Sequence, residues 1–256
     1  MYHTGGCLLT SRARRTIGIV FALPQEQRGL EQVLLESHSS FYRSGNLRTW
    51  YLKELTLLVA VGGVGRKRCT QATQELLEAG AQWILSAGFA AALDPSIRVG
   101  DIIVADRVLS NEDNEEAIAC DQRLVRTIPP SGKFGFVIRH GSLVSWNSVV
   151  CAAAEKNQIH RTTGAAALDM ESYAAAQVCA RAKVPFAAVR SISDTANENL
   201  PEVTRRLATT PEAFRVGIIL MSNPQAWFPL LKLRRQAELA ANNLGEVLGL
   251  MLLRLV

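Results

Sequence analysis

The chain has 256 residues, of which 48% are hydrophobic and 20% are charged. This length suits one large domain, and the apolar fraction is sufficient for a buried core of alanine, valine, leucine and isoleucine. The formal net charge is +5, but the basic residues are scattered, and there is no zinc-finger spacing, aromatic RNA-recognition motif or long basic helix. An anionic ligand or an acidic membrane surface would account for the basic excess equally well, so we expect no nucleic-acid partner.

In the first third of the chain, apolar runs alternate with helical patterns. Residues 16–22 form a continuous apolar run typical of a central strand, and Pro24 suits the first position of the helix that follows. A glycine-rich turn occupies residues 62–66. The patterns predict strands over 16–22, 42–52 and 55–61, and helices from Pro24 and over 67–79.

The same alternation continues to residue 194. Residues 167–172 combine a short apolar strand, a sharp acidic corner and the start of a helix rich in small residues. The predicted elements are strands over 83–88, 99–105, 140–144 and 185–194, and helices over 150–156 and 172–182. Residues 195–210 mix turn and helix signals, a pattern compatible with a flap.

Residues 229–256 are strongly helical, with apolar residues recurring at helical spacing. These apolar residues are Leu230, Leu233, Ala237, Ala240, Ala241, Leu244 and Leu248. We favour packing of this face onto the sheet. The alternative is peripheral contact with a membrane surface, which aromatic and basic residues near the start of the helix would support. Those residues are Trp227, Phe228, Lys232, Arg234 and Arg235.

The regular alternation of strands and helices predicts a single α/β domain over residues 16–256, built as a three-layer α/β/α sandwich. Residues 1–15 are expected to be a disordered N-terminal extension. The five cysteines are far apart and none forms Cys-x-x-Cys, which favours free thiols in a reducing cytoplasm. No apolar stretch has signal-peptide character or reaches the roughly 18 residues that a spanning helix needs.

Two acidic residues are the centre of the functional hypothesis. Glu171 follows the short strand and Asp194 ends the last one. We expect them to meet at the carboxyl ends of adjacent strands, because that rim of an open α/β sheet binds small ligands. Each also has a simpler interpretation, Glu171 as a first-turn acid after an Asp169 cap and Asp194 as a turn residue. Glu26 is likewise compatible with a first-turn acid favoured by the helix dipole.

The glycine-rich turn at residues 62–66 is a weaker candidate. Backbone N–H groups at the start of a helix can hold an anion. The turn matches neither the phosphate-binding loop nor the dinucleotide fingerprint, and a plain tight turn is the alternative interpretation. The four histidines have no metal-ligand or catalytic-triad spacing, so we predict no metal site and no cofactor.

Five segments occur in the order and at the spacing of a known enzyme family. They are residues 17–26, 62–66, 86–105, 169–172 and 184–194. In these segments the chain resembles the purine nucleoside phosphorylase / 5′-methylthioadenosine and S-adenosylhomocysteine nucleosidase superfamily. The resemblance covers nearly the whole chain from Thr16 to about Asn197, and it implies a sandwich whose mixed central sheet is partly barrel-like.

The resemblance also implies cleavage of the N-glycosidic bond of a purine nucleoside. In that family the residue matching Glu26 activates the attacking water, and a Ser–Asp pair, matching Ser193 and Asp194, protonates N7 of the purine. The residue matching Glu171 holds the ribose hydroxyls, and the residue matching Met170 packs under the sugar. Glu26, Ser193 and Asp194 are therefore the predicted catalytic residues.

Further positions are predicted to bind the substrate or the nucleophile. In the family, the glycine-rich turn and the arginine matching Arg190 lie near the sugar and the nucleophile. The predicted substrate-binding residues are Met170, Glu171, Arg190, Phe89, Ala90, Ala91, Val149 and Val150. The predicted anion- or nucleophile-binding residues are Gly63, Gly65 and Arg66.

The chemistry of the bond accounts for these residue types. A glycosidic bond breaks through an oxocarbenium-like state, so the leaving base has to be protonated and the cationic sugar stabilised. Asp194 would need its pKa raised from about 3.9 toward about 6 or 7, which costs roughly 3 to 4 kcal/mol and is within what burial supplies. Arg190 shares a strand face with Asp194, and a free cation there would lower that pKa. We therefore predict that Arg190 is paired elsewhere, with Glu171 or a bound anion.

Several departures from the nucleosidase pattern bear on the substrate. They are Phe89-Ala90-Ala91 in place of a Ser-Ala-Gly-type loop, Asp169 in place of a glutamate, Val149 about where an aromatic stacks on the base, and Trp146-Asn147 in place of a Gly-Asp pair. The Asp-Met-Glu-Ser sequence and the leucine-rich tail also resemble the hopanoid-associated (adenosylhopane) branch, which removes adenine from an adenosyl-lipid. An amphipathic tail would suit such a substrate.

These observations leave three hypotheses open. The first is hydrolysis of a 5′-substituted, adenosine-type nucleoside by water, with release of adenine. The second is phosphorolysis or an adenosyl-lipid-specific variant, with phosphate as co-substrate near Gly63, Gly65 and Arg66. The third is a non-catalytic nucleoside-binding protein. A dinucleotide-binding dehydrogenase is disfavoured because the first strand lacks the glycine fingerprint, and family analogy implies a homodimer.

Overall fold

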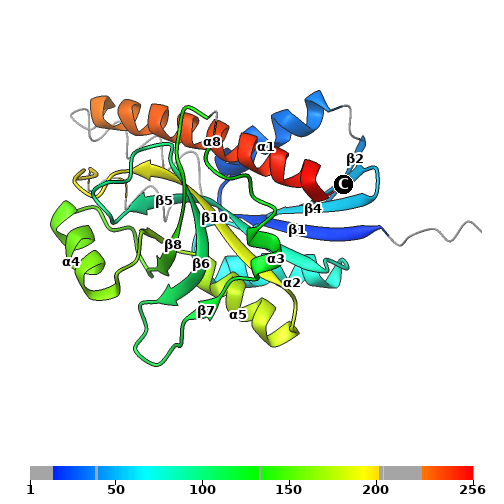
Figure 1. Cartoon of the computed structure of the whole chain (residues 1–256), viewed down its shortest axis with the longest axis horizontal. Coiled ribbons are helices and arrows are strands. Elements are labelled where there is room, and N and C mark those ends of the chain that lie inside the picture. Colours follow the sequence, from blue (N-terminus) through cyan, green and yellow to red (C-terminus); the bar gives the residue numbers. More distant parts are fainter. Residues whose placement is uncertain (1–13, 38–39, 133, 202–203, 205–226, 256) are drawn as a thin grey trace, which may run out of the picture.

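The computed structural model describes residues 14–37, 40–132, 134–201, 204 and 227–255, with the side chains of the last helix described from residue 231 (Figure 1). The strands are β1 (Arg15–Phe21), β2 (Ser40–Ser44), β3 (Leu47–Leu52), β4 (Leu55–Val61), β5 (Trp83–Ala92), β6 (Ile102–Ser110), β7 (Ile118–Ala119), β8 (Ile138–Ser145), β9 (Ala167–Asp169) and β10 (Phe186–Asp194). The helices are α1 (Pro24–Glu36), α2 (Arg66–Glu78), α3 (Gln122–Val125), α4 (Ala153–Thr163), α5 (Ser172–Ala182) and α8 (Trp227–Leu255).

All of these strands belong to one mixed sheet that closes on itself. The hydrogen-bonded order is β10-β6-β8-β9-β5-β1-β4-β3-β2, and β10 also pairs with β5. The extra pairing joins β5, β10, β6, β8 and β9 into a five-stranded barrel, with β1 to β4 extending the sheet on one side. The predicted mixed, partly barrel-like sheet is therefore confirmed.

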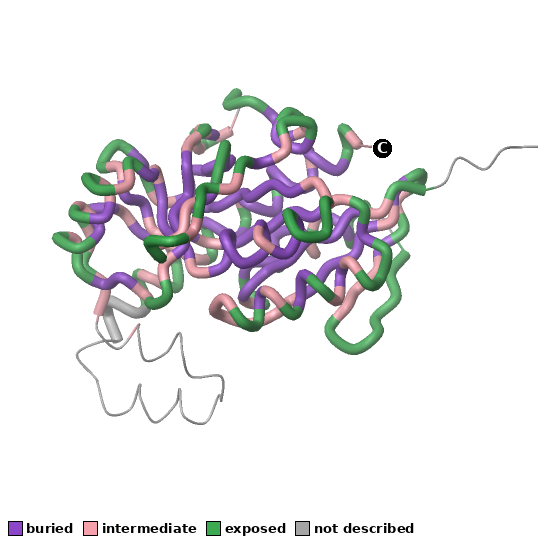
Figure 2. Tube along the Cα trace, turned by 90° about the horizontal axis from the view of Figure 1, so that it is seen from below, coloured by how far each residue is buried: buried purple, intermediate pink, exposed green. Residues whose placement is uncertain are grey.

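Helices cover the sheet on both sides, as the sandwich prediction requires. Figure 1 shows α1 and α8 along one side and α2 and α5 along the other. Buried residues form a continuous band through the centre of the molecule (Figure 2), and most belong to a single apolar cluster. The strands of this cluster are rich in alanine, valine, leucine and isoleucine, so burial on both faces accounts for their continuous apolar runs.

The C-terminal helix packs against α1 and the sheet. Its inward face buries residues at helical spacing, namely Ala240, Ala241, Leu244, Val247, Leu248, Met251 and Leu252. At the crossing with α1, a Cβ atom added to Gly29 would lie 2.1 Å from the carbonyl oxygen of Ala241. The two backbones approach this closely because Gly29 and Gly245 carry no side chain.

The predicted packing of the tail helix onto the sheet is confirmed for its described side chains. The side chains of Trp227 and Phe228, which would support the alternative of membrane contact, lie outside the described residues. None of the described helices combines the length and apolar character needed to cross a membrane.

Some predicted elements differ from those observed. The single strand predicted over 42–52 is wrong, because Gly45 adopts a positive φ of 58° and turns the chain into the β2–β3 hairpin. The strand predicted over 83–88 continues to Ala92, and the helix predicted over 150–156 begins at Ala153 and continues to Thr163. β1 starts at Arg15, the last residue of the predicted extension, and residues 1–13 lie outside the described part of the chain.

Candidate active site

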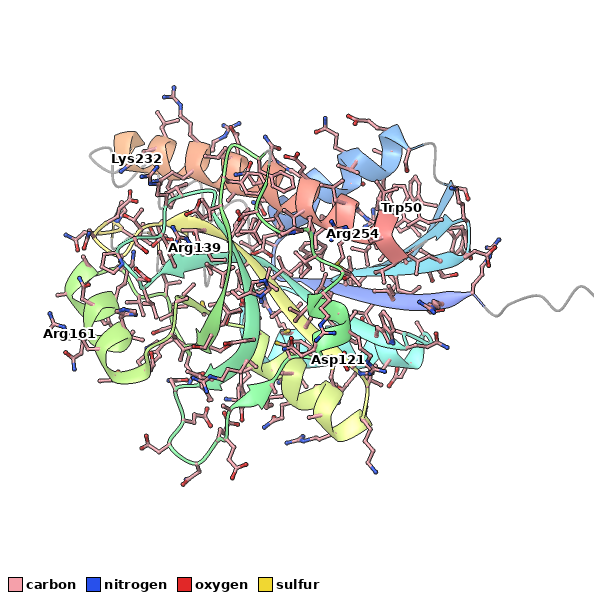
Figure 3. All side chains as sticks on the ribbon, viewed as in Figure 1. Trp50, Asp121, Arg139, Arg161, Lys232 and Arg254 are labelled. Atoms are coloured by element: carbon pink, nitrogen blue, oxygen red, sulfur yellow. The ribbon has the colours of Figure 1, made fainter. Side chains whose placement is uncertain are left out.

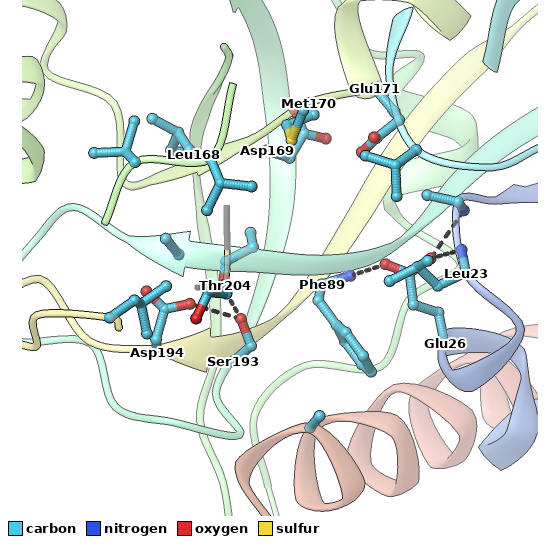
Figure 4. Close-up of a pocket in the computed structure, with 18 of the residues that line it drawn as sticks. Leu23, Glu26, Phe89, Leu168, Asp169, Met170, Glu171, Ser193, Asp194 and Thr204 are labelled. Carbon is cyan, nitrogen blue, oxygen red and sulfur yellow. Dashed lines mark hydrogen bonds between the residues drawn. The ribbon is translucent and has the colours of Figure 1, made fainter. Parts of the chain in front are cut away.

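A cavity of about 310 Å³ opens beside β5, β9 and β10 and the first turn of α1. Figure 4 shows its polar groups in two places, with Ser193 and Asp194 on one side and Glu26 and Glu171 on the other. The predicted site residues that line it are Glu26, Phe89, Ala90, Ala91, Val149, Val150, Met170, Glu171, Ser193 and Asp194. Segments far apart in the sequence, from the first helix to the last strand, thus meet around one space.

The strands that bring Glu171 and Asp194 to this cavity are not the adjacent pair that was predicted. β9 and β10 are not adjacent strands, because β5 lies between them and pairs with both. Leu168 of β9 pairs antiparallel with Ala91 of β5, and Asp194 pairs in the parallel direction with the same Ala91. The two acids therefore meet because the ends of both strands reach one point on β5.

Glu26 is held by backbone groups on two elements. Its Oε2 accepts hydrogen bonds from the N–H groups of Ala22 and Leu23, each at 2.8 Å, and its Oε1 accepts one from Phe89 at 2.9 Å. It therefore caps α1 at the same time as it lines the cavity. Burial raises the pKa of Glu26, and the three backbone hydrogen bonds and Arg190 oppose that rise. A carboxylate has about four acceptor positions, so one stays open for a water molecule.

The close fit around Glu26 depends on Gly88. A Cβ atom at this position would lie 2.7 Å from Oε1 of Glu26. We expect Gly88→Ala to displace the carboxyl group and lower the rate of base release by about 10- to 100-fold, since small displacements of reacting groups have effects of this size. The rate is measured with the substrate panel described below. Gly135→Ala, in an exposed bend with nothing within 4 Å of the added atom, tests the effect of a mere Gly-to-Ala change; equal rates for the two variants would contradict the role of the space at Gly88.

A buried ion pair supports the floor of the cavity. Arg190 donates to Asp169 through Nε at 2.8 Å, and Nη2 lies 2.7 Å from the same Oδ2. Asp169 also accepts from Ser145 at 2.6 Å and from the backbone of Ser172 at 3.0 Å, and Arg190 donates to Ser86 at 2.8 Å. Arg190 does not line the cavity. The prediction that it pairs away from Asp194 is confirmed, but its partner is Asp169 and not Glu171.

Glu171 sits at the start of α5 and accepts a hydrogen bond from the backbone N–H of Gly65 at 2.8 Å. Burial raises the pKa of Glu171 to about 8, and the nearby charges of Asp169 and Glu26 contribute to that rise. The guanidinium of Arg190 pairs with Asp169, and the charges of Glu26 and Glu171 also act on it and raise the pKa of Arg190. This part of the cavity carries a surplus of negative charge, which a bound proton or a cationic ligand would reduce.

Ser193 lies at a β-bulge in β10, where the register shifts between Ile192 and Asp194. Ser193 Oγ donates to Oδ1 of Asp194 at 2.7 Å, and Nζ of Lys156 on α4 donates to Oδ2. The sequence interpretation missed Lys156. The available signal was its position three residues before the buried Ile159, which places it on the inward face of α4.

The glycine-rich turn holds a protein side chain in this structure. The N–H of Gly65 donates to Glu171, and Arg66 pairs with Glu112 at 3.0 Å and with Glu115. The guanidinium of Arg66 also lies over the ring of Tyr173, 5.3 Å from its centroid. Gly63, Gly65 and Arg66 do not line the cavity, although Val64 of the same turn does. Within the described part of the chain, no three histidine, cysteine or acidic side chains gather as a metal site would need.

Comparisons with known proteins place this chain in a family. The sequence profile described as the phosphorylase superfamily matches residues 16–216. The 5′-methylthioadenosine/S-adenosylhomocysteine nucleosidase of Staphylococcus aureus is 28% identical over 204 residues, which cover 71% of this chain and 87% of that protein. The enzyme of the same name from Mycobacterium tuberculosis is 25% identical over 223 residues, covering 71% and 86%.

Solved structures show the same fold. The 5′-methylthioadenosine/S-adenosylhomocysteine nucleosidase of Helicobacter pylori superposes with a TM-score of 0.70 and 19% identity, covering 94% of this chain and 99% of its own. Futalosine hydrolase of the same organism also gives a TM-score of 0.70 and 19% identity, covering 93% and 97%. Because the family profile spans most of the sequence and these structures share its fold, the chain belongs to the phosphorylase superfamily.

Proposed function

We propose that this protein cleaves the N-glycosidic bond of an adenosine-type nucleoside with a 5′ substituent, using water and releasing adenine. The observation that carries the proposal is the charge of the cavity. Glu26, Asp169 and Glu171 all line it, and the cation on which their charges act is Arg190, which pairs with Asp169. A sugar that loses its base becomes cationic, and a preorganised surplus of negative charge stabilises that state more than the neutral substrate.

The same charge favours water over phosphate as the nucleophile. A phosphate dianion would meet the carboxyl groups of Glu26 and Glu171, and Arg190 is already paired with Asp169. Arg66, the other cation predicted to bind an anion, is paired with Glu112 and Glu115. Water has no charge to be repelled, and the open acceptor position of Glu26 can take its proton.

The proposed reaction has two ends. At one end Glu26 takes a proton from water as the oxygen bonds to C1′ of the sugar. At the other end the C1′–N9 electron pair passes to the base, and Asp194, held by Ser193, gives its proton to N7. Met170 lies between these ends on the cavity wall and Glu171 lies on the side of Glu26, and the sugar and its hydroxyl groups would bind beside these two residues.

The relatives are named for different substrates, so the 5′ substituent is a separate question. The curated relatives are named for 5′-methylthioadenosine and S-adenosylhomocysteine, and one solved neighbour is a futalosine hydrolase. In this chain the cavity wall includes the apolar side chains of Val64, Leu200 and Leu233. An apolar substituent therefore fits better than a charged one, and this lining keeps an adenosyl-lipid as the second candidate substrate.

The test is a panel of 5′-substituted adenosines incubated with and without phosphate, with mass spectrometry of the released base and sugar. We expect adenine and the free sugar, at a rate that added phosphate leaves unchanged. A sugar 1-phosphate formed only with phosphate would replace hydrolysis by phosphorolysis. Thermal stabilisation by these ligands without any cleavage would instead identify a nucleoside-binding protein.

We also infer that the protein acts as a homodimer in the cytoplasm. The support is family analogy for the dimer and the pattern of scattered cysteines for the compartment. Membrane contact through α8 stays a prediction, and release of adenine from an adenosyl-lipid presented in vesicles would be the relevant assay.

A further inference from the structure

A lysine lies buried directly behind the proposed proton donor. Lys156 is the fourth residue of α4, and its side chain is fully buried. Its Nζ donates to Oδ2 of Asp194, whose carboxyl group lines the cavity. A lysine is almost never fully buried unless it is paired, so this position demands a specific partner.

The surroundings of Lys156 match an ammonium group. Besides Asp194, its Nζ donates to the carbonyl oxygens of Thr195 and Glu198, each at 3.0 Å. An ammonium group has three N–H donors and no acceptor, whereas a neutral amine would turn a lone pair toward one of these oxygens. These three acceptors therefore suit the ammonium form of Lys156. Through its hydrogen bonds, Lys156 links Asp194 to the turn that follows β10.

No other cation faces Asp194 among the described residues. Ser193 donates to Oδ1, and Ala90 and Ala91 of the neighbouring β5 carry no charge. Glu198 lies in the turn after β10, and its carboxylate is held by Lys232 and Gln236 of α8. Burial raises the pKa of Asp194, the charge of Glu198 adds to that rise, and Lys156 and Ser193 oppose it.

We propose that Lys156 is a positioning residue for base protonation, which fixes the Asp194 carboxyl group and neutralises the carboxylate that remains when the base takes the proton. This inference rests on the proposed function. As the C1′–N9 bond breaks, its electron pair passes to the base, N7 takes the proton of Asp194, and Asp194 becomes a carboxylate. The ammonium group of Lys156 favours that product of the transfer, so it makes Asp194 a stronger acid.

The test compares pH profiles of adenine release for wild type and Lys156→Met, whose side chain has a similar length without the charge. Activity is lost as the pH rises through the pKa of Asp194, because the ionised group has no proton to give. Without the cation we expect this alkaline limb to move up by about 1 to 3 pH units. The plateau kcat should fall about 10- to 100-fold with a smaller change in KM, because a weaker acid transfers its proton less readily.

Two further variants separate charge from packing. Lys156→Arg keeps a cation and should keep the alkaline limb at the wild-type position. Lys232→Met removes a surface cation of α8 (Figure 3) that bonds Glu198 of the same turn at 2.7 Å, and it should leave the profile unchanged. If Lys156→Met does not fold, Lys156→Gln supplies N–H donors to the two carbonyl groups without the charge and should show the same shift.

The outcomes distinguish this inference from the function it rests on. A wild-type protein that cleaves the nucleosides, together with an uncharged Lys156 variant whose alkaline limb does not move, overturns the inference alone. A limb that moves as far in Lys156→Arg as in Lys156→Met would reduce Lys156 to a packing residue. A wild-type protein that releases no base from any nucleoside overturns both proposals.

Discussion

Replacing Glu26 with glutamine is expected to slow adenine release by about 10²- to 10⁴-fold, the usual contribution of a general base. The neutral amide cannot take the proton of the attacking water. The loss should appear in kcat, because Glu26 faces the nucleophile and the remaining cavity wall still binds the nucleoside. Initial rates of adenine release and thermal stabilisation by a nucleoside analogue measure the two effects separately.

The geometry of Glu26 requires a control for folding. Both of its oxygens accept backbone N–H groups, so the amide introduced by Glu26→Gln would direct an N–H toward another N–H at one end. We expect a loss of about 1 to 3 kcal/mol in unfolding free energy from that mismatch. Glu31→Gln is the matched control, since Glu31 is on the same helix and pairs with Arg48 outside the cavity. A folded Glu26→Gln protein with the wild-type rate would leave Glu26 only as a helix cap.

The double role of Glu26 explains why its sequence position was ambiguous. A glutamate in the first turn of a helix is expected from the helix dipole alone, and the structure confirms that Glu26 caps α1. Its approach to Phe89 is a contact between residues 63 apart, which no local pattern contains. Only the five ordered segments of the family resemblance predicted that this cap would also face the cavity.

The fold was predictable to the extent that it follows from local patterns. Continuous apolar runs identified β1, β4 and β10, because strands buried on both faces need no polar alternation. The β2–β3 hairpin was missed because an alternating run continues through Gly45, whose positive φ reverses the chain. Closure of the barrel depends on β10 pairing with both β5 and β6, which is a long-range property of the chain.

Charges inside the site were the least predictable feature. Arg190 and Asp194 share a strand in the sequence, but the partner of Arg190 is Asp169, 21 residues earlier. The cation that does meet Asp194 is Lys156, from a helix whose sequence is mostly polar. Which cation pairs with a buried carboxylate depends on proximity in three dimensions. The free-energy cost of leaving such a charge unpaired can be judged only when its burial is known.

The buried ion pair of Arg190 and Asp169 gives the largest expected effect on stability. Arg190→Met is expected to lower the unfolding free energy by about 3 to 5 kcal/mol, because it leaves Asp169 buried without a cation. Asp169 is 4% exposed and Arg190 is 2% exposed, so water cannot replace the lost partner. Urea unfolding followed by circular dichroism measures the change.

Two comparisons show whether the lost charge pair is the cause. Arg139→Met removes a half-exposed arginine that lies 3.8 Å from Asp101 (Figure 3), and it should cost less than about 1 kcal/mol. Adding Asp169→Asn to Arg190→Met removes the unpaired charge and should restore part of the stability, since an amide can still bond Ser145 and Ser172. Strictly additive losses in the double variant would mean that Arg190 stabilises the barrel by its packing volume, and that its pairing with Asp169 contributes little.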